Sequence, residues 1–130
     1  PEVALGVLPG TGGTQRLARV LGKAKAIELM CEGTLVDYER AAALGLVNQV
    51  WVAEGFLDQA TAYARSFCPP QKASMAVGHI KRAVQAGAEM SLENGLALER
   101  ELQQRLFESE DAREGLAAFN DKRKPEFRGR

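Results

Sequence analysis

The residue best suited to proton transfer is Glu2, which follows Pro1 and precedes the apolar run Val3, Ala4 and Leu5. Apolar neighbours desolvate a carboxylate, which raises its pKa toward the range of a general acid or base. The competing interpretation is a solvated carboxylate near the terminus, and on composition alone that situation is the more frequent one. Glu2 is therefore a candidate acid/base group with both interpretations open.

The densest glycine cluster spans residues 9–16, Pro-Gly-Thr-Gly-Gly-Thr-Gln-Arg, and precedes a helical pattern. Free amides at the start of a helix can hold an anion. The cluster nevertheless has neither the Gly-Lys-Ser/Thr of a P-loop nor the Gly-x-Gly-x-x-Gly spacing of a dinucleotide site. The alternative, which the residues favour, is a tight turn with closely crossing backbone.

The other reactive side chains point to no identifiable chemistry. His79 has no serine or cysteine at a spacing that marks a nucleophile, so we expect a residue at the edge of a helix. Cys31 and Cys68 stand where small apolar residues would serve, and we predict thiols in or near the core. One histidine and no paired cysteines cannot supply a recognisable metal site.

The last ten residues carry a net positive charge. Residues 121–130 contain five Lys or Arg side chains and two Asp or Glu side chains. Such a segment could bind phosphates by charge. It could equally balance the dipole at the end of the preceding helix.

Composition limits the class of protein. The chain has 130 residues, 17 basic and 17 acidic side chains and 45% apolar residues, which suits one domain with a modest core. Zero net charge argues against bulk electrostatic binding of nucleic acid, and no apolar run approaches the roughly 20 residues of a membrane span. No secretory signal opens the sequence. Because the chain begins at Pro1 without methionine, inside an apolar stretch, we expect that an upstream part is missing.

Helical signals dominate the elements that must position these residues. Apolar spacing and helix-ending glycines or prolines predict helices over 11–21, 23–32, 54–67 and 71–86. Three more helices are predicted from their capping residues Asp37, Ser91 and Ser109, the first of them ending at Gly45. Alternation over 47–52 predicts one short strand, which has no obvious partner in the chain. The fold class is therefore mainly α with one short strand.

The motifs at the two ends of the chain together resemble the signature of the enoyl-CoA hydratase/isomerase family, the crotonase superfamily. The opening match reads Pro-Glu-x-x-Leu-Gly-x-x-Pro-Gly-x-Gly-Gly-Thr-Gln-Arg-Leu-x-Arg over residues 1–19. It continues through Gly22, Gly33 and Gly45, and closes on Arg-Glu-Gly-x-x-Ala-Phe-x-x-Lys-Arg-x-Pro-x-Phe over residues 113–127. The resemblance thus covers essentially the whole chain.

The resemblance implies roles for four residues. Glu2 resembles one of two glutamates that move protons when water adds across the double bond of an enoyl thioester. Gly10 resembles the position whose backbone amide helps hold the catalytic water, and a side chain there would obstruct that water. Phe119 resembles a residue that lines the acyl pocket, and Lys122 one that reaches the phosphates of coenzyme A, in the family often from a neighbouring subunit. No cofactor or metal is implied, because coenzyme A is part of the substrate.

The resemblance also implies an architecture. Residues 1–52 would form the end of a crotonase core, and residues 53–130 a helical trimerisation region, within a larger α/β fold. We expect an acyl-CoA or enoyl-CoA substrate and a homo-oligomer, a trimer or a dimer of trimers, with no nucleic-acid or membrane partner. The expected location is the bacterial cytoplasm or the mitochondrial matrix, not outside the cell.

Three functions stay open. The first is hydration of 2-enoyl-CoA, and the second is double-bond isomerisation with the single glutamate Glu2. The third is a non-catalytic helical module that completes a neighbour's coenzyme A site. The family's oxyanion hole and first glutamate lie upstream of the Pro-Glu pair, so we expect residues 1–130 alone to be nearly inactive.

Overall fold

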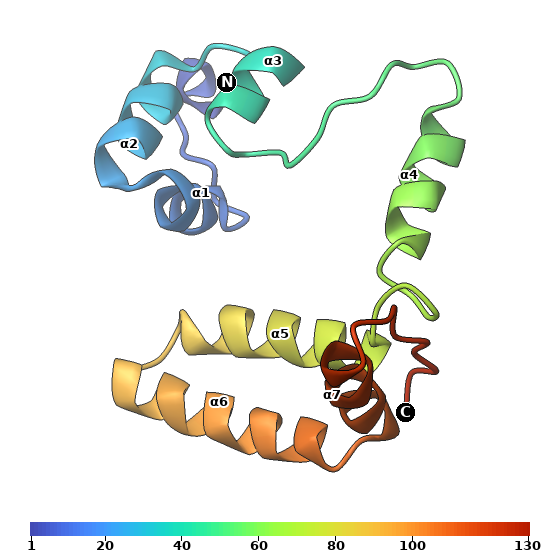
Figure 1. Ribbon diagram of the computed structural model, residues 1–130. Helices are drawn as coiled ribbons and strands as arrows, with labels where there is room; N and C mark the ends of the chain where they lie inside the picture. Colours follow the sequence, from blue (N-terminus) through green and yellow to red (C-terminus); the bar gives the residue numbers. More distant parts are fainter. The chain divides into compact units, whose positions relative to one another are not determined.

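The computed structural model describes residues 1–130, and all of its regular secondary structure is helical (Figure 1). The chain divides into two compact units, Pro1–Glu54 and Gly55–Arg130. In chain order the helices are the 3₁₀ helix η1 (Glu2–Leu5) and the α-helices α1 (Gly13–Leu21), α2 (Lys23–Glu32), α3 (Tyr38–Ala43), α4 (Phe56–Arg65), α5 (Ser74–Gly87), α6 (Leu92–Phe107) and α7 (Glu110–Asn120). The mainly α class is confirmed, and the ends of the four helices predicted with bounds shift by up to three residues.

In the first unit, α2 is the central element. Both α1 and η1 pack against it, and the buried side chains of this unit are Ala26, Leu29 and Ala41. Only Leu29 among them is large, so the apolar core of the unit is small. The unit consequently depends on well-defined helix ends as well as on burial.

The ends of α3 show how the sequence sets those boundaries. The Asp37 carboxylate accepts a hydrogen bond of 2.7 Å from the backbone N–H of Arg40, as expected of an N-cap. At the other end, Gly45 has a φ of 76°, which lets the N–H of Leu46 donate to the carbonyl of Ala41 at 2.9 Å. Both the predicted cap and the predicted left-handed stop are confirmed.

In the second unit, α5 and α6 lie side by side, and α7 contacts α6 (Figure 1). Ser91 and Ser109 cap α6 and α7 as predicted, since their hydroxyl oxygens accept from the N–H groups of Asn94 and Ala112 at 3.3 and 3.0 Å. The apolar core consists of Leu102, which is 2% exposed, and Ala118, which is fully buried. α4 is not packed along another helix.

The predicted strand over 47–52 does not form. These residues are bends and irregular backbone in the structure. Strand geometry is stabilised by hydrogen bonds to a neighbouring strand, and the chain contains no other strand. Alternating apolar residues alone therefore did not produce a strand here.

The predicted burial of several side chains is also wrong. Cys31 and Cys68 are free thiols, and both are exposed instead of lying in the core. The apolar faces of α4 and α5 are largely open as well, with Phe56, Ile80 and Val84 exposed. α6 packs along α5 but leaves Ile80 and Val84 exposed, and no helix packs along α4.

We predict opposite effects for alanine at two helical glycines. A Cβ at Gly13 would lie 2.6 Å from the Cβ of the rigid Pro9 ring, whereas a Cβ at Gly78 would meet nothing within 4 Å. Gly13→Ala should lower the free energy of unfolding by about 1–3 kcal/mol. Gly78→Ala should raise it by about 0.5–1 kcal/mol, because alanine favours a helix interior. Urea unfolding checks both, and a stable Gly13→Ala protein would contradict the close contact.

Candidate functional site

Glu2 is the first residue of η1, and its side chain is 44% exposed. The pKa of its carboxyl is lowered, first because its own backbone N–H donates to it and then because the N-terminal ammonium group of Pro1 donates to it. The ammonium nitrogen lies 3.1 Å from Oε2. Of the two interpretations of Glu2, residues 1–130 show the solvated carboxylate, because the side chain is too exposed for desolvation to outweigh these donors.

A mostly apolar hollow of about 400 Å³ lies beside Glu2 within the first unit. Its polar lining residues besides Glu2 are Arg16 and Thr34, and the others are apolar or glycine. They are Pro1, Pro9, Gly13, Leu17, Leu29, Met30, Val36 and Leu46. Such a hollow can bind an apolar ligand, and a carboxylate at its edge can exchange protons with a reactive bond of that ligand.

The glycine cluster forms a tight turn at residues 10–12 before α1. Gly12 has a φ of 94°, and its carbonyl accepts the first helical hydrogen bond from Arg16 at 3.0 Å. Gly10 itself is exposed, and a Cβ there would make only ordinary contacts with Leu8 at 3.7 Å. Packing within the unit thus leaves room for a side chain at Gly10. The role of the Gly10 amide in holding water stays a prediction.

Phe119 and Lys122 lie together at the end of α7 in the second unit. The Phe119 side chain is 82% exposed. Lys122 is the only residue other than glycine with a left-handed φ, 55°, and its N–H donates to the carbonyl of Phe119 at 3.3 Å. The next N–H, of Arg123, donates to the carbonyl of Ala118 at 3.0 Å. Lys122 thus occupies the helix-ending position that normally favours glycine.

One carboxylate fixes the turn after Lys122. The guanidinium of Arg123 donates to both oxygens of Glu114, at 2.6 and 2.9 Å, and the N–H of Glu126 donates to Glu114 Oε1 at 2.9 Å. These donors, with Arg123 as the largest cause, lower the pKa of Glu114 to about 2. The same pair raises the pKa of Arg123. We call these residues, Glu114, Arg123 and Glu126, the tail clamp.

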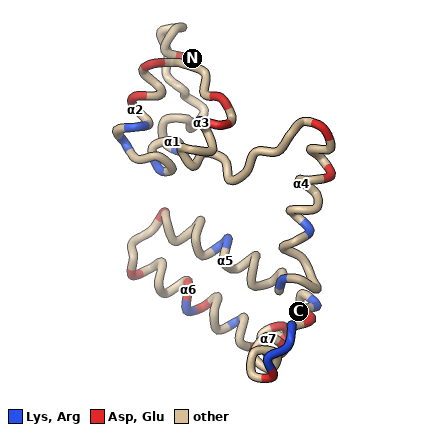
Figure 2. Tube along the Cα trace, turned by 45° about the horizontal axis from the view of Figure 1, so that its top comes forward, with Lys and Arg blue, Asp and Glu red and all other residues tan.

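A second carboxylate of α7 holds the last residues. Asp111 is only 3% exposed, and its two oxygens accept from the N–H groups of Arg128 and Gly129 at 2.7 and 2.8 Å. Its own N–H donates to the carbonyl of Arg130 at 2.8 Å. Figure 2 shows the resulting juxtaposition of basic tail and acidic residues beside α7.

Sequence reasoning missed both Asp111 and Glu114. Their spacing of three places them on one side of α7, facing the basic segment that follows. That spacing was the available signal, but it was not connected with the basic segment that follows the helix. The structure shows that they bind backbone amides and an arginine of the tail.

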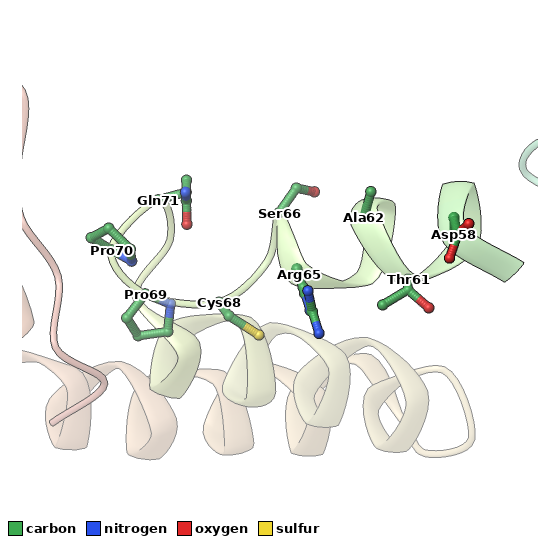
Figure 3. Close-up of a pocket in the computed structure, with 9 residues that line it drawn as sticks. All are labelled: Asp58, Thr61, Ala62, Arg65, Ser66, Cys68, Pro69, Pro70 and Gln71. Carbon is green, nitrogen blue, oxygen red and sulfur yellow. The ribbon is translucent and has the colours of Figure 1, made fainter.

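A second, open hollow of about 750 Å³ lies along α4 and the loop that follows it (Figure 3). Its charged lining residues are Asp58 and Arg65, and the loop contributes Cys68 and a cis bond between Pro69 and Pro70. None of the four predicted site residues lines it.

His79 is half-buried in α5, and no hydrogen-bond partner reaches its Nδ1 atom. No group of three or more metal-binding side chains is present. None of the helices has the length and apolar character needed to cross a membrane.

Comparison with known proteins identifies the family. A family model described as Enoyl-CoA hydratase/isomerase matches residues 1–130. The chain belongs to the enoyl-CoA hydratase/isomerase family. A probable enoyl-CoA hydratase of Rhizobium meliloti is 46% identical over 133 residues, covering 100% of this chain and 50% of the relative. The 2,3-dehydroadipyl-CoA hydratase of Escherichia coli is 38% identical over 130 residues, again with 50% of the relative covered.

Solved structures of the family match the fold of this chain. A crystal structure described as an enoyl-CoA hydratase of Geobacillus kaustophilus matches with a TM-score of 0.90 and 45% identity, over 100% of this chain and 48% of the solved one. The expectation that the chain is part of a crotonase-type fold is thereby confirmed. The chain spans about half the length of the curated relatives it matches.

The tail clamp should weaken only in strong acid. The pKa of Glu114 is lowered from 4.5 to about 2, so its stabilising contribution is fully present above about pH 4.5 and is lost as the pH falls toward 2. Amide hydrogen exchange of Glu126 should therefore accelerate, beyond its intrinsic pH dependence, only within that window. Glu114→Gln should abolish this extra change, and Glu99→Gln in α6 is the matched control. Protonation of Glu114 near its ordinary pKa would contradict the clamp.

Proposed function

We propose that this chain belongs to an enoyl-CoA hydratase, a lyase that adds water reversibly to 2-enoyl-CoA thioesters in fatty-acid or related acyl-CoA metabolism. The family match over the full chain, with relatives named as hydratases at 38–46% identity, is the main support. The placement of Glu2 beside an apolar hollow supports it independently.

Glu2 is proposed to carry out proton transfer. Its carboxylate acts first as a base. It takes a proton from water while the water oxygen bonds to the β carbon of the enoyl group. Glu2 then gives this proton to the α carbon and returns to its charged form. The enolate that develops on the thioester needs hydrogen-bond donors, which the family carries upstream of the Pro-Glu pair.

Glu2→Gln tests this assignment in the gene product that contains these 130 residues. Glutamine keeps the size of the side chain but cannot accept a proton, so kcat for hydration of crotonyl-CoA should fall about a hundred- to ten-thousandfold. Glu28→Gln is the matched control, because Glu28 lies in the same unit and is paired with Lys25 outside the hollow. Near-normal turnover of Glu2→Gln would dismiss the role of Glu2.

Double-bond isomerisation is the alternative activity. A relative from Mycosarcoma maydis, 41% identical over 130 residues, is named enoyl-CoA isomerase/hydratase. Glu2 alone could move a proton from one substrate carbon to another, with no water consumed. A glutamate about twenty residues before Glu2 in the gene product would favour hydration, and an apolar residue there would favour isomerisation.

For substrate binding, we propose that Phe119 lines the acyl pocket and that Lys122 binds a phosphate of coenzyme A. The Phe119 ring is exposed, and the Lys122 ammonium group forms no ion pair, unlike the neighbouring Arg123. Coenzyme A enters as part of the substrate, and the reaction requires no separate cofactor.

The chain is also proposed to assemble into a homotrimer or a dimer of trimers. Large apolar side chains on α4, α5 and α7 are exposed, among them Phe56, Ile80 and Leu116, and burial against other copies would remove them from water. A non-catalytic role as a helical oligomerisation module rests on the same faces. The proposed location is the bacterial cytoplasm or the mitochondrial matrix, since one relative is bacterial and one, from Dictyostelium discoideum, is named mitochondrial.

Light scattering of the gene product tests the assembly. We expect a mass of three or six copies, independent of moderate salt because the proposed contacts are apolar. Replacing Ile80 with aspartate should shift the mass toward smaller species, while Lys81→Asp on the same helix serves as the control. A well-folded monomer would refute both the trimer and the oligomerisation module.

A further inference from the structure

The conformation of Lys122 is costly unless something holds it. A left-handed φ disfavours a residue with a Cβ by roughly 1 kcal/mol or more, and every other left-handed residue in the chain is a glycine. A lysine keeps this unfavourable backbone conformation only when contacts of the surrounding residues hold it there. The residues that could do this are those that follow Lys122 directly.

The tail clamp supplies that constraint. Arg123 is the next residue, and two hydrogen bonds of 2.6 and 2.9 Å join its guanidinium to Glu114, which is one helical turn before Ala118. The N–H of Glu126 donates to the same carboxylate. The backbone on the C-terminal side of Lys122 is thus held at Arg123 and Glu126, while its N-terminal side is held by α7.

The carboxylates near Lys122 pair with arginines, so the Lys122 ammonium group can bind an anion. Arg123 is neutralised by Glu114, and Arg130 pairs with Glu110 at 3.0 Å. The Lys122 ammonium group is exposed and pairs with no carboxylate, although Asp121 lies next to it in the chain and contacts Arg123 instead, at 3.5 Å. An incoming anion therefore does not have to break an existing pair at Lys122.

We infer that Glu114 is a positioning residue for substrate binding: through Arg123 and Glu126 it holds the left-handed turn that presents Lys122 to a phosphate group. This inference rests on the proposed role of Lys122 in binding coenzyme A. Glu114 does not touch the ligand in this account. It acts by keeping the lysine backbone in one conformation, so that less conformational entropy is lost on binding.

A double-mutant cycle in the gene product tests the inference, with coenzyme A as the probe in titration calorimetry and crotonyl-CoA in kinetics. Lys122→Ala should raise the Kd for coenzyme A about three- to tenfold and reduce its salt dependence. Glu114→Gln should raise the Kd and the KM by a similar factor with kcat nearly unchanged. In the Lys122→Ala background, Glu114→Gln should add nothing further. Lys124→Ala and Glu101→Gln are the matched controls.

The outcomes separate the two proposals. An unchanged Kd for Lys122→Ala would refute the role of Lys122, and with it the inference about Glu114. If Lys122→Ala weakens binding but Glu114→Gln does not, or if the two effects simply add, only the positioning role is overturned. Should Glu114→Gln fail to fold, Arg123→Lys replaces it, because lysine keeps the charge but loses the two-pronged contact. Unaltered binding in Arg123→Lys would then overturn the positioning role.

Discussion

Two carboxylates on one side of α7 determine where the C-terminal segment lies. A backbone N–H that leaves water must find another acceptor, and the nearly buried Asp111 provides both of its oxygens to successive amides of the tail. Glu114, one turn further along, accepts from the N–H of Glu126 with Oε1 and from the guanidinium of Arg123 with both oxygens. Residues 123–130 are thereby fixed to the helix that carries Phe119. The conformation of the turn between them, and so of Lys122, follows from these contacts.

The two units use different means to position their predicted site residues. In the first, the apolar core is small, and η1, which begins at Glu2, packs on α2 beside the hollow. In the second, a polar network does the positioning, with short charge-assisted hydrogen bonds around Glu114. Each unit therefore positions one kind of proposed residue, an acid/base group in the first and a phosphate-binding cation in the second.

Local signals in the sequence predicted much of this structure. The caps at Asp37, Ser91 and Ser109 and the stop at Gly45 depend on contacts within a few residues, so they could be read directly. The sequence did not show that residues 47–52 form no strand or that Cys31 is exposed. Both outcomes depend on whether another segment packs against these residues, and periodicity does not reveal that. The sequence could not decide between the two interpretations of Glu2 for a related reason. Its sequence neighbours are apolar, yet its side chain is half-exposed and meets hydrogen-bond donors. The tail clamp joins positions 9 to 12 residues apart, beyond the range of a local pattern.

We propose that the gene product containing this chain adds water to an enoyl thioester. The most direct measurement is to incubate that protein with crotonyl-CoA in water labelled with a heavy oxygen isotope and to analyse the thioester by mass spectrometry. Hydration predicts a 3-hydroxyacyl product that carries one labelled oxygen on the β carbon. A protein that consumes no crotonyl-CoA, or that shifts a double bond without taking up label, would contradict the account.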